Sequence, residues 1–222
     1  MTARVASLHR WPVKSMGGVG VDVLEVDARG AAGDRAWAVY DEFKGAPRRL
    51  TAREAPRLLL WHATGEQVAG PNGTTFALGD PGLAAALSAD LGRPVTLRHD
   101  PALQQDLPDS LLVTFGASHR KVEEALGPLD ARRWRTNVHV EGDAEPYAEA
   151  GWEGRELHVG EARLRLLHPC ERCAIPTRDP DTAEKDPRIL KHLAAEHTLL
   201  FGINARALHP ATIRVGDAVA LQ

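Results

Sequence analysis

The chain opens with the segment RVASLHRWPVKSMGGVGVDVLEVDARGAAGDRAWAVY, residues 4–40, in which apolar runs are separated by glycines. Three runs have the alternating or continuous apolar pattern of strands: 4–9, 19–26 and 36–40. We expect Val5 and Leu8 to point inward, and Gly17-Gly18 and Gly30 to mark turns. Strands this short and this closely spaced favour a small barrel or sandwich over alternating strand–helix units.

The remainder of the chain carries fewer but recognisable signals. Strand-like patterns occur at 58–63 and in a terminal hairpin at 211–221, and helical patterns occur at 83–91, 118–126 and 185–197. Asp80 and Ser118 are the expected N-caps of the first two helices, which Gly92 and Gly127 follow. Pro71-Asn72-Gly73 is a hairpin turn signal. A shift in composition near 100–108 predicts two domains, 1–105 and 106–222.

Composition excludes several classes of protein. The 222 residues carry 27 Lys and Arg against 30 Asp and Glu, a net charge of −3, so no global basic field exists to hold a nucleic acid. A hydrophobic fraction of 43% argues against disorder, and two cysteines cannot form a disulfide framework. No apolar run approaches the roughly 18 residues of a membrane span, and Arg4, His9 and Arg10 interrupt any signal-peptide pattern. We therefore expect a soluble cytoplasmic protein.

The segment HPCERC, residues 168–173, places both cysteines of the chain three positions apart. A thioredoxin-type redox pair requires this motif to open a helix, and Pro176 and Pro180 argue against a helix there. A second interpretation is a structural zinc site completed by His192 and His197. The 18 residues before His192 exceed the usual loop of about 12–15, and the two histidines are separated by about 140° on a helix.

A third interpretation makes one thiolate the ligand of a metal cofactor and keeps it ionised through neighbouring cations such as Arg172. The remaining alternative is a pair of half-buried cysteines with no chemical role.

A second candidate feature is cationic. RRWRTN, residues 132–137, runs directly into the strand-like segment 138–140. If the strand includes these residues, Arg133 and Arg135 share a face beside Asn137, an arrangement that suits a phosphate or another anion rich in oxygen. The alternative is a solvated charged strand.

Other polar residues stand at the ends of predicted strands. Lys14-Ser15 and Arg35 add cations and a hydroxyl, and Asp109-Ser110 is either a polar ligand pair or a turn. The sequence contains no phosphate-binding P-loop, no dinucleotide fingerprint, no His-Glu-x-x-His motif and no Gly-x-Ser-x-Gly motif. The common hydrolase and dinucleotide-binding classes therefore lose support.

Several of these segments, taken in order, resemble the conserved motifs of MOSC proteins. The matching segments are Trp11-Pro12-Val13-Lys14-Ser15, Gly33-Asp34-Arg35-Ala36-Trp37, Leu50-Thr51-Ala52-Arg53 with Pro56-Arg57-Leu58, Arg133-Trp134-Arg135-Thr136-Asn137, Pro169-Cys170-Glu171-Arg172-Cys173, Asp179-Pro180-Asp181-Thr182, Leu200-Phe201-Gly202 and Thr212-Ile213-Arg214-Val215-Gly216-Asp217. The resemblance implies a mainly β (α+β) fold with a few short helices. An N-terminal MOSC β-barrel domain would occupy 1–105 and a MOSC β-barrel domain 106–222.

The resemblance also implies a cofactor and a reaction. The family binds a molybdenum–molybdopterin cofactor through one protein cysteine and reduces N-hydroxylated compounds such as amidoximes and hydroxylamines. Cys173 would then be the metal ligand and a catalytic residue, and Asp109 or a bound water is the candidate proton donor. The candidate cofactor-binding residues are Lys14, Ser15, Arg35, Arg133, Arg135, Asn137, Cys173 and Asn204.

The sequence departs from the family pattern at three positions. Glu171 stands where the amidoxime-reducing members have Ser, Asn204 replaces a Tyr that contacts the cofactor, and Ala183 replaces a Gly. Two cysteines are too few for a fused iron–sulfur domain, so the expected electron donor is a separate flavin, iron–sulfur or haem protein. The alternative function is a non-catalytic carrier of molybdenum cofactor or sulfur.

Overall fold

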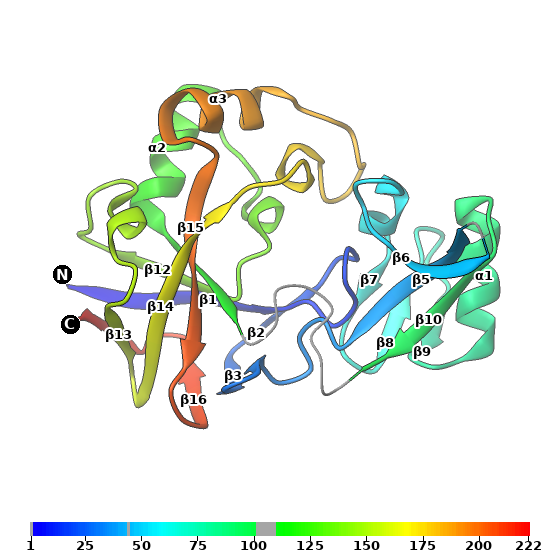
Figure 1. The fold of residues 1–222 in the computed structure, drawn as a ribbon, viewed down its shortest axis with the longest axis horizontal. Coiled ribbons are helices and arrows are strands. Elements are labelled where there is room, and N and C mark those ends of the chain that lie inside the picture. The colour runs from blue at the N-terminus through cyan, green and yellow to red at the C-terminus, as the bar shows by residue number, and fades with distance from the viewer. Residues whose placement is uncertain (1, 44, 101–109) are drawn as a thin grey trace.

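The computed structural model describes residues 2–43, 45–100 and 110–222. Two lobes lie side by side, and both chain termini lie at the outer side of the larger lobe (Figure 1). The described residues include three short α-helices, α1 (Pro81–Leu91), α2 (Gly116–Leu126) and α3 (Arg188–His197), and the rest of the regular structure is mostly strand. The predicted mainly β fold with a few short helices is confirmed.

The larger lobe is built around a closed barrel. Its 7 strands, in the order in which they neighbour one another, are β12 (Val138–Gly142), β11 (Leu111–Phe115), β15 (Leu200–Ala207), β14 (Ala162–Glu171), β13 (Glu156–Val159), β17 (Ala218–Leu221) and β1 (Ala3–Arg10). The barrel closes because β1 pairs antiparallel with β12 as well as with β17. Closure leaves no unpaired edge within this ring of strands.

Strand β1 shows how a small irregularity fills the barrel. Val5 and Leu8 are each 1% exposed and belong to the same core, as predicted. They are an odd number of residues apart, so a regular strand would send them to opposite faces. A shift of register between Val5 and Ser7, opposite β12, absorbs one residue and turns both side chains inward.

Strand pairing joins the two halves of the chain across the predicted domain boundary. β1 pairs with β12 and β17, and β3 (Val23–Asp27) pairs with β16 (Ala211–Arg214) in a small sheet that also includes β4 (Gly30–Ala31). β2 (Val19–Val21) extends the barrel sheet beside β1. The N-terminal segment therefore contributes strands to the larger lobe, and the division at residue 105 stays a prediction.

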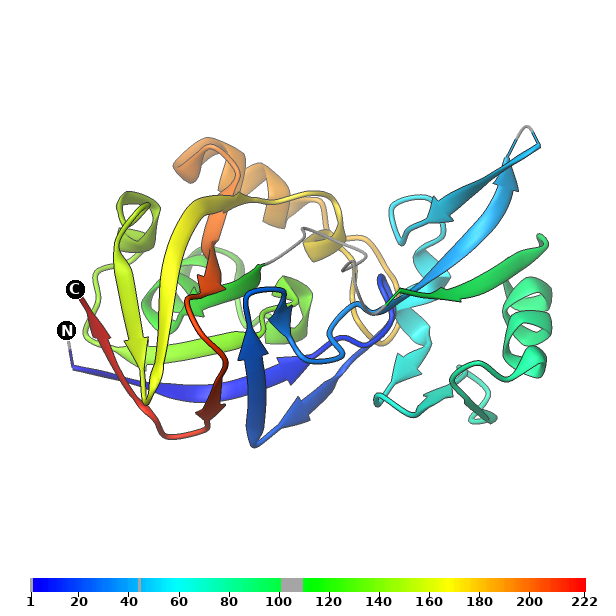
Figure 2. The same cartoon turned by 60° about the horizontal axis from the view of Figure 1, so that its bottom comes forward.

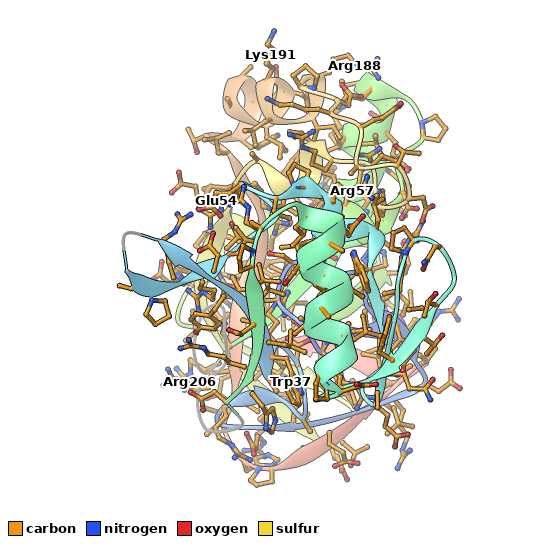
Figure 3. All side chains as sticks on the ribbon, turned by 90° about the vertical axis from the view of Figure 1, so that its right-hand side faces the viewer. Trp37, Glu54, Arg57, Arg188, Lys191 and Arg206 are labelled. Carbon is orange, nitrogen blue, oxygen red and sulfur yellow. The ribbon has the colours of Figure 1, made fainter. Side chains whose placement is uncertain are left out.

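The smaller lobe consists of two short sheets and α1. One sheet contains β10 (Val95–His99), β5 (Trp37–Phe43) and β6 (Ala46–Leu50), and the other contains β7 (His62–Ala63), β8 (Gln67–Ala69) and β9 (Thr75–Ala77). Figure 2 shows the strands β5 and β6 reaching away from the larger lobe, and Figure 3 looks onto α1 from this side. Leu83 and Leu87 of α1 pack into the lobe's own core.

The connection between β1 and β2 ties the smaller lobe to the barrel. Val13 and Met16 are fully buried in the core of the smaller lobe. The Lys14 backbone N–H donates to the carbonyl of Trp37 at 2.8 Å, and that of Gly17 donates to Trp61 at 2.7 Å. A Cβ at Gly17 would lie 2.3 Å from the His62 ring, so this close approach requires glycine.

Several local predictions were wrong. Segment 58–63 is mostly a 3-10 helix (Pro56–Leu60), because the proline at its start favours a helical turn and only His62–Ala63 is paired as a strand. Strands β16 and β17 pair with β3 and with β1 and β13, not with each other, so they form no terminal hairpin. Ser118 does not cap α2, which begins at Gly116, and its hydroxyl instead binds the Glu149 carboxylate.

Other local predictions were confirmed. The Asp80 side chain caps α1 through the Gly82 N–H, and Gly92 ends that helix in the left-handed conformation. Gly127 follows the end of α2. Pro71-Asn72-Gly73 lies in the turn between the paired strands β8 and β9. The third helix begins at Arg188, three residues later than predicted.

A buried histidine makes the stability of this fold dependent on pH. Burial, followed by the nearby His139 and Arg172, lowers the pKa of His119 to about 3. Its ring contacts the Thr114 hydroxyl at 3.3 Å and packs edge-on against Trp134 and Phe201. Because the unfolded chain binds a proton here below about pH 6.5 and the folded chain does not, protonation favours unfolding.

We therefore predict that His119 lowers the free energy of unfolding by roughly 2 kcal/mol as the pH falls from 6.5 to 5. Urea unfolding of wild type and His119→Gln at several pH values in this range gives the free energy of unfolding as a function of pH. The contribution of His119 is the difference between the two slopes of that free energy against pH. His209→Gln, at an exposed position, is the matched control and should keep the wild-type slope. Equal slopes for wild type and His119→Gln would contradict the prediction.

Candidate functional site

A cavity of about 470 Å³ gathers residues that lie far apart in the sequence. Its lining comes mainly from the β1–β2 connection, the segment before β5, the start of β11, the turn before β12, the end of β14 and strand β15. The lining residues are Lys14, Ser15, Arg35, Arg53, Ser110, Leu112, Trp134, Arg135, Asn137, His168, Pro169, Cys170, Glu171, Arg172, Cys173, Ile175, Leu200 and Asn204. Five of these side chains are cationic and two are thiols. The cavity therefore suits an anionic ligand that contains an atom, such as a metal, to which a thiolate can bind.

Three lining residues adopt the left-handed backbone conformation although none of them is glycine. Ser15 has a φ of 72°, Arg35 of 48° and Arg135 of 53°. Such a conformation costs free energy for residues with a Cβ and persists where surrounding contacts hold it in place. All three are less than 9% exposed, which shows that packing fixes them.

Asp34 holds the first of these arginines. Its carboxylate forms a buried ion pair with Arg35 and also accepts the backbone N–H of Trp11 at 2.7 Å. Arg35 further donates to the Asn137 amide oxygen at 3.3 Å and to the backbone carbonyl of Arg135 at 3.1 Å. One buried guanidinium thus connects the N-terminal segment to the turn before β12.

Trp11 holds the second arginine. The guanidinium of Arg135 lies 4.4 Å from the centre of the Trp11 ring and donates to the backbone carbonyl of Met16 at 2.7 Å. The indole N–H of Trp11 donates to the carbonyl of Thr136 at 2.9 Å. Cation–π contact and hydrogen bonding therefore orient Arg135 along the cavity wall.

Asn137 has a structural task at the cavity wall. It is fully buried, and its side-chain oxygen accepts the Leu112 N–H at 3.1 Å as well as the Arg35 guanidinium. Its amide nitrogen donates to the carbonyl of His9 at 3.2 Å. The side chain thereby links β1, β11 and Arg35.

Both cysteines are free thiols that line the cavity, Cys170 within β14 and Cys173 two residues after its end. Arg172 donates to the Cys170 sulfur at 3.2 Å and to the carbonyl of Trp134 at 2.7 Å. The Ser15 hydroxyl and the Arg172 Nε are buried and have no hydrogen-bond partner among the described residues. Buried polar atoms of this kind are usually satisfied, so these two are available to a bound group.

The structure brings most of the predicted site residues together. Those that line the cavity are Lys14, Ser15, Arg35, Arg135, Asn137, Cys173 and Asn204. Asp109 lies outside the described residues. Asn204 donates to the carbonyl of His168 at 3.3 Å, which fixes its amide at the wall.

Arg133 is the exception, because the predicted strand does not begin there. Residues Ala131–Trp134 form a 3-10 helix whose start is capped by the Asp130 side chain, and β12 begins only at Val138. The alternation of a strand therefore does not apply, and Arg133 turns away to pair with Asp179 at 2.8 Å. The expectation that Arg133 and Arg135 share a strand face was wrong.

Two contributions to the site were not predicted. Trp11 and Asp34 were recognised only as motif positions, whereas the structure shows that they orient Arg135 and Arg35. Trp11 contacts Arg135, more than a hundred residues away, whereas Asp34 pairs with the adjacent Arg35. No spacing pattern in the sequence predicts these two contacts.

The alternative zinc site loses support. His192 and His197 lie on α3 and do not line the cavity that holds the cysteines. Within the described ranges, no group of three or more His, Cys, Asp or Glu side chains is placed to bind one metal ion.

No helix of the described ranges combines the length and apolarity needed to cross a membrane.

Comparison with known proteins agrees with this architecture. The chain is 28% identical to mitochondrial amidoxime-reducing component 1 of Homo sapiens, with 98% of this chain and 82% of that protein aligned. It is 24% identical to the protein of the same name from Mus musculus over the same shares. The solved structure of the YUAD protein from Bacillus subtilis matches with a TM-score of 0.55 at 16% identity, covering 100% of this chain and 96% of that one, and this shows a shared fold.

Two families match successive parts of the chain. Residues 2–86 match the MOSC N-terminal beta barrel domain, and residues 107–220 match the MOSC domain. The second match covers half of the chain and includes both cysteines and the turn that carries Arg135. The chain therefore belongs to the MOSC domain family.

Proposed function

We propose that this protein binds a molybdenum–molybdopterin cofactor in the cavity, with Cys173 as the protein ligand of the metal. We further propose that it reduces N-hydroxylated compounds, such as amidoximes and hydroxylamines, with electrons from a separate donor protein. Membership of the MOSC domain family and the similarity to mitochondrial amidoxime-reducing component 1 support this assignment. The observation that carries it is the convergence of Lys14, Arg35 and Arg135 with Cys173 on one cavity.

The chemistry of the cavity fits such a cofactor. A phosphate and a polar pterin require cations and hydrogen-bond donors, and the unpartnered Ser15 hydroxyl and Arg172 Nε supply donors beside the buried cations. Arginine is suited to oxygen-rich anions because its planar fork donates several hydrogen bonds at once. A soft thiolate suits a metal that cofactor sulfurs also bind.

The chain's own residues divide the work as follows. Lys14, Ser15, Arg35 and Arg135 hold the anionic and polar parts of the cofactor, and Asn137 keeps Arg35 and β11 in place. Cys173 supplies the thiolate. Asn204 lines the wall near His168, and Asp109 stays a candidate proton donor.

When bound, the cofactor supplies two-electron redox chemistry and a site that accepts oxygen. The overall reaction breaks the N–O bond, places one hydrogen on the nitrogen and releases the oxygen as water. It consumes two electrons and two protons. The electrons come from a flavin, iron–sulfur or haem protein, and the free thiols suit the reducing cytoplasm that we propose as its location.

Metal analysis tests the cofactor assignment. Protein purified from a host that makes the cofactor should contain close to one molybdenum per chain and little zinc. Cys173→Ala should lose most of the molybdenum, because no second protein ligand is proposed. Cys170→Ala is the matched control and should retain it, since this thiol contacts Arg172 instead. Stoichiometric zinc without molybdenum would overturn the proposal.

Activity separates a reductase from a carrier. With an artificial electron donor, the molybdenum-loaded protein should convert benzamidoxime to benzamidine, and Cys173→Ala should not. Molybdenum binding without turnover of a range of amidoximes and hydroxylamines would favour a cofactor carrier.

The buried ion pair behind the cavity gives a further prediction. Asp34→Asn keeps an acceptor for Trp11 but removes the negative charge of the buried Asp34–Arg35 pair, so it should lower the free energy of unfolding by about 3 kcal/mol. Retained molybdenum should also fall, because Arg35 loses its orientation. Asp27→Asn, which breaks the exposed pair with Arg29, should change the free energy of unfolding far less and leave molybdenum unchanged. Urea unfolding and metal analysis measure both effects, and equal behaviour of the two variants would contradict the prediction.

A further inference from the structure

The cavity carries one negative charge among its many positive ones. Glu171 ends β14, lies opposite Leu200 of β15 in the strand register, and lines the cavity together with that residue. It is the one acidic side chain among the described residues that form the lining. Unlike Lys14, Arg35 and Arg135, which are buried, Glu171 is exposed.

None of the five lining cations forms an ion pair with this carboxylate among the described residues. Arg172, its neighbour in the chain, donates to the Trp134 carbonyl and to the Cys170 sulfur. Arg35 is paired with Asp34, and Arg135 donates to the Met16 carbonyl. Within the described part of the chain, the Glu171 carboxylate forms no ion pair and accepts no hydrogen bond.

We infer that Glu171 is a specificity-determining residue that favours positively charged N-hydroxylated substrates and disfavours negatively charged ones. This inference rests on the proposed function. Glu171 and Cys173 are two residues apart on the same wall, so a molecule that reaches the Cys173 thiol through the exposed part of the cavity passes a free carboxylate. A single charge several ångströms from such a molecule changes its local concentration about fivefold in a water-filled cavity, and added salt weakens the effect.

The first experiment measures the effect of the Glu171 charge on molecules that approach Cys173, and it does not depend on catalysis. In the full-length Cys170→Ser protein from a host that lacks the cofactor, Cys173 is modified with two methanethiosulfonates, one carrying a trimethylammonium group and one a sulfonate. Each reagent forms a mixed disulfide with the thiolate and releases methanesulfinate. The ratio of the two rates cancels any change in the intrinsic reactivity of the thiol, and so reports the charge of the approach.

Because the carboxylate attracts the cationic reagent and repels the anionic one about fivefold each, Glu171→Gln should lower the ratio of cationic to anionic rates about 25-fold at low ionic strength, and Glu171→Lys should lower it further. Glu153→Gln is the matched control, because Glu153 is exposed but does not line the cavity, and it should leave the ratio unchanged. An unchanged ratio in Glu171→Gln would overturn the inference.

The second experiment uses the molybdenum-loaded protein and two benzamidoximes that carry a fixed trimethylammonium or sulfonate group at the para position. The kcat/KM ratio of cationic to anionic substrate should fall about 25-fold at low ionic strength in Glu171→Gln and remain unchanged in Glu153→Gln. If neither compound is reduced while the thiol-modification ratio still depends on Glu171, the reductase assignment fails and the charge selection at the cavity stands. If both are reduced with a ratio that ignores Glu171, the inference fails and the reductase assignment stands.

Discussion

The burial of Asp34 against Arg35 and Trp11 is the contact on which both the fold and the site depend. Asp34 is 2% exposed, so its charge requires compensation, and Arg35 provides it from the next position in the chain. Arg35 adopts the left-handed conformation here, and its guanidinium also donates to Asn137 and the Arg135 carbonyl. The N-terminal segment and the turn before β12 are thereby joined through buried charges, and not through apolar packing alone.

The same contact explains why cations from distant segments meet at one cavity. Trp11 is tied to Asp34 through its backbone and to Thr136 through its indole, and it provides the ring on which Arg135 lies. Trp11 itself is held in place because Val13 and Met16, which follow it in the β1–β2 connection, are buried in the core of the smaller lobe. Ser15, Arg35 and Arg135 all adopt the strained left-handed backbone conformation, so the structure holds these side chains in place without a bound ligand.

The sequence predicted most strands from local alternation but not their partners. Alternation identified Val5 and Leu8 as inward-facing, whereas the register shift that reconciles them depends on β12, which lies far along the chain. The two terminal strands were predicted to form a hairpin because they are adjacent in sequence. In the structure, β16 pairs with β3 and β17 pairs with β1. Arg133 was placed with Arg135 because a strand was assumed, and a side-chain cap at Asp130 made the segment a 3-10 helix instead. Local pattern singled out Arg135, Asn137 and the two cysteines, but only the family resemblance placed them in one site with Lys14, Ser15 and Arg35. No local pattern encodes a contact between segments a hundred residues apart.

The exposures of the lining residues separate two tasks within one cavity. Lys14, Ser15, Arg35 and Arg135 are between 2% and 8% exposed, so a group bound to them is held away from solvent, where each charge–charge contact is strong. Glu171 is exposed, so water and salt screen its charge, and its effect on a nearby molecule is modest. A carboxylate among the buried cations would pair with one of them and weaken anion binding. At the exposed end of β14 it does not pair with those cations, and in the role that we infer it acts on the charge of a molecule that enters the cavity.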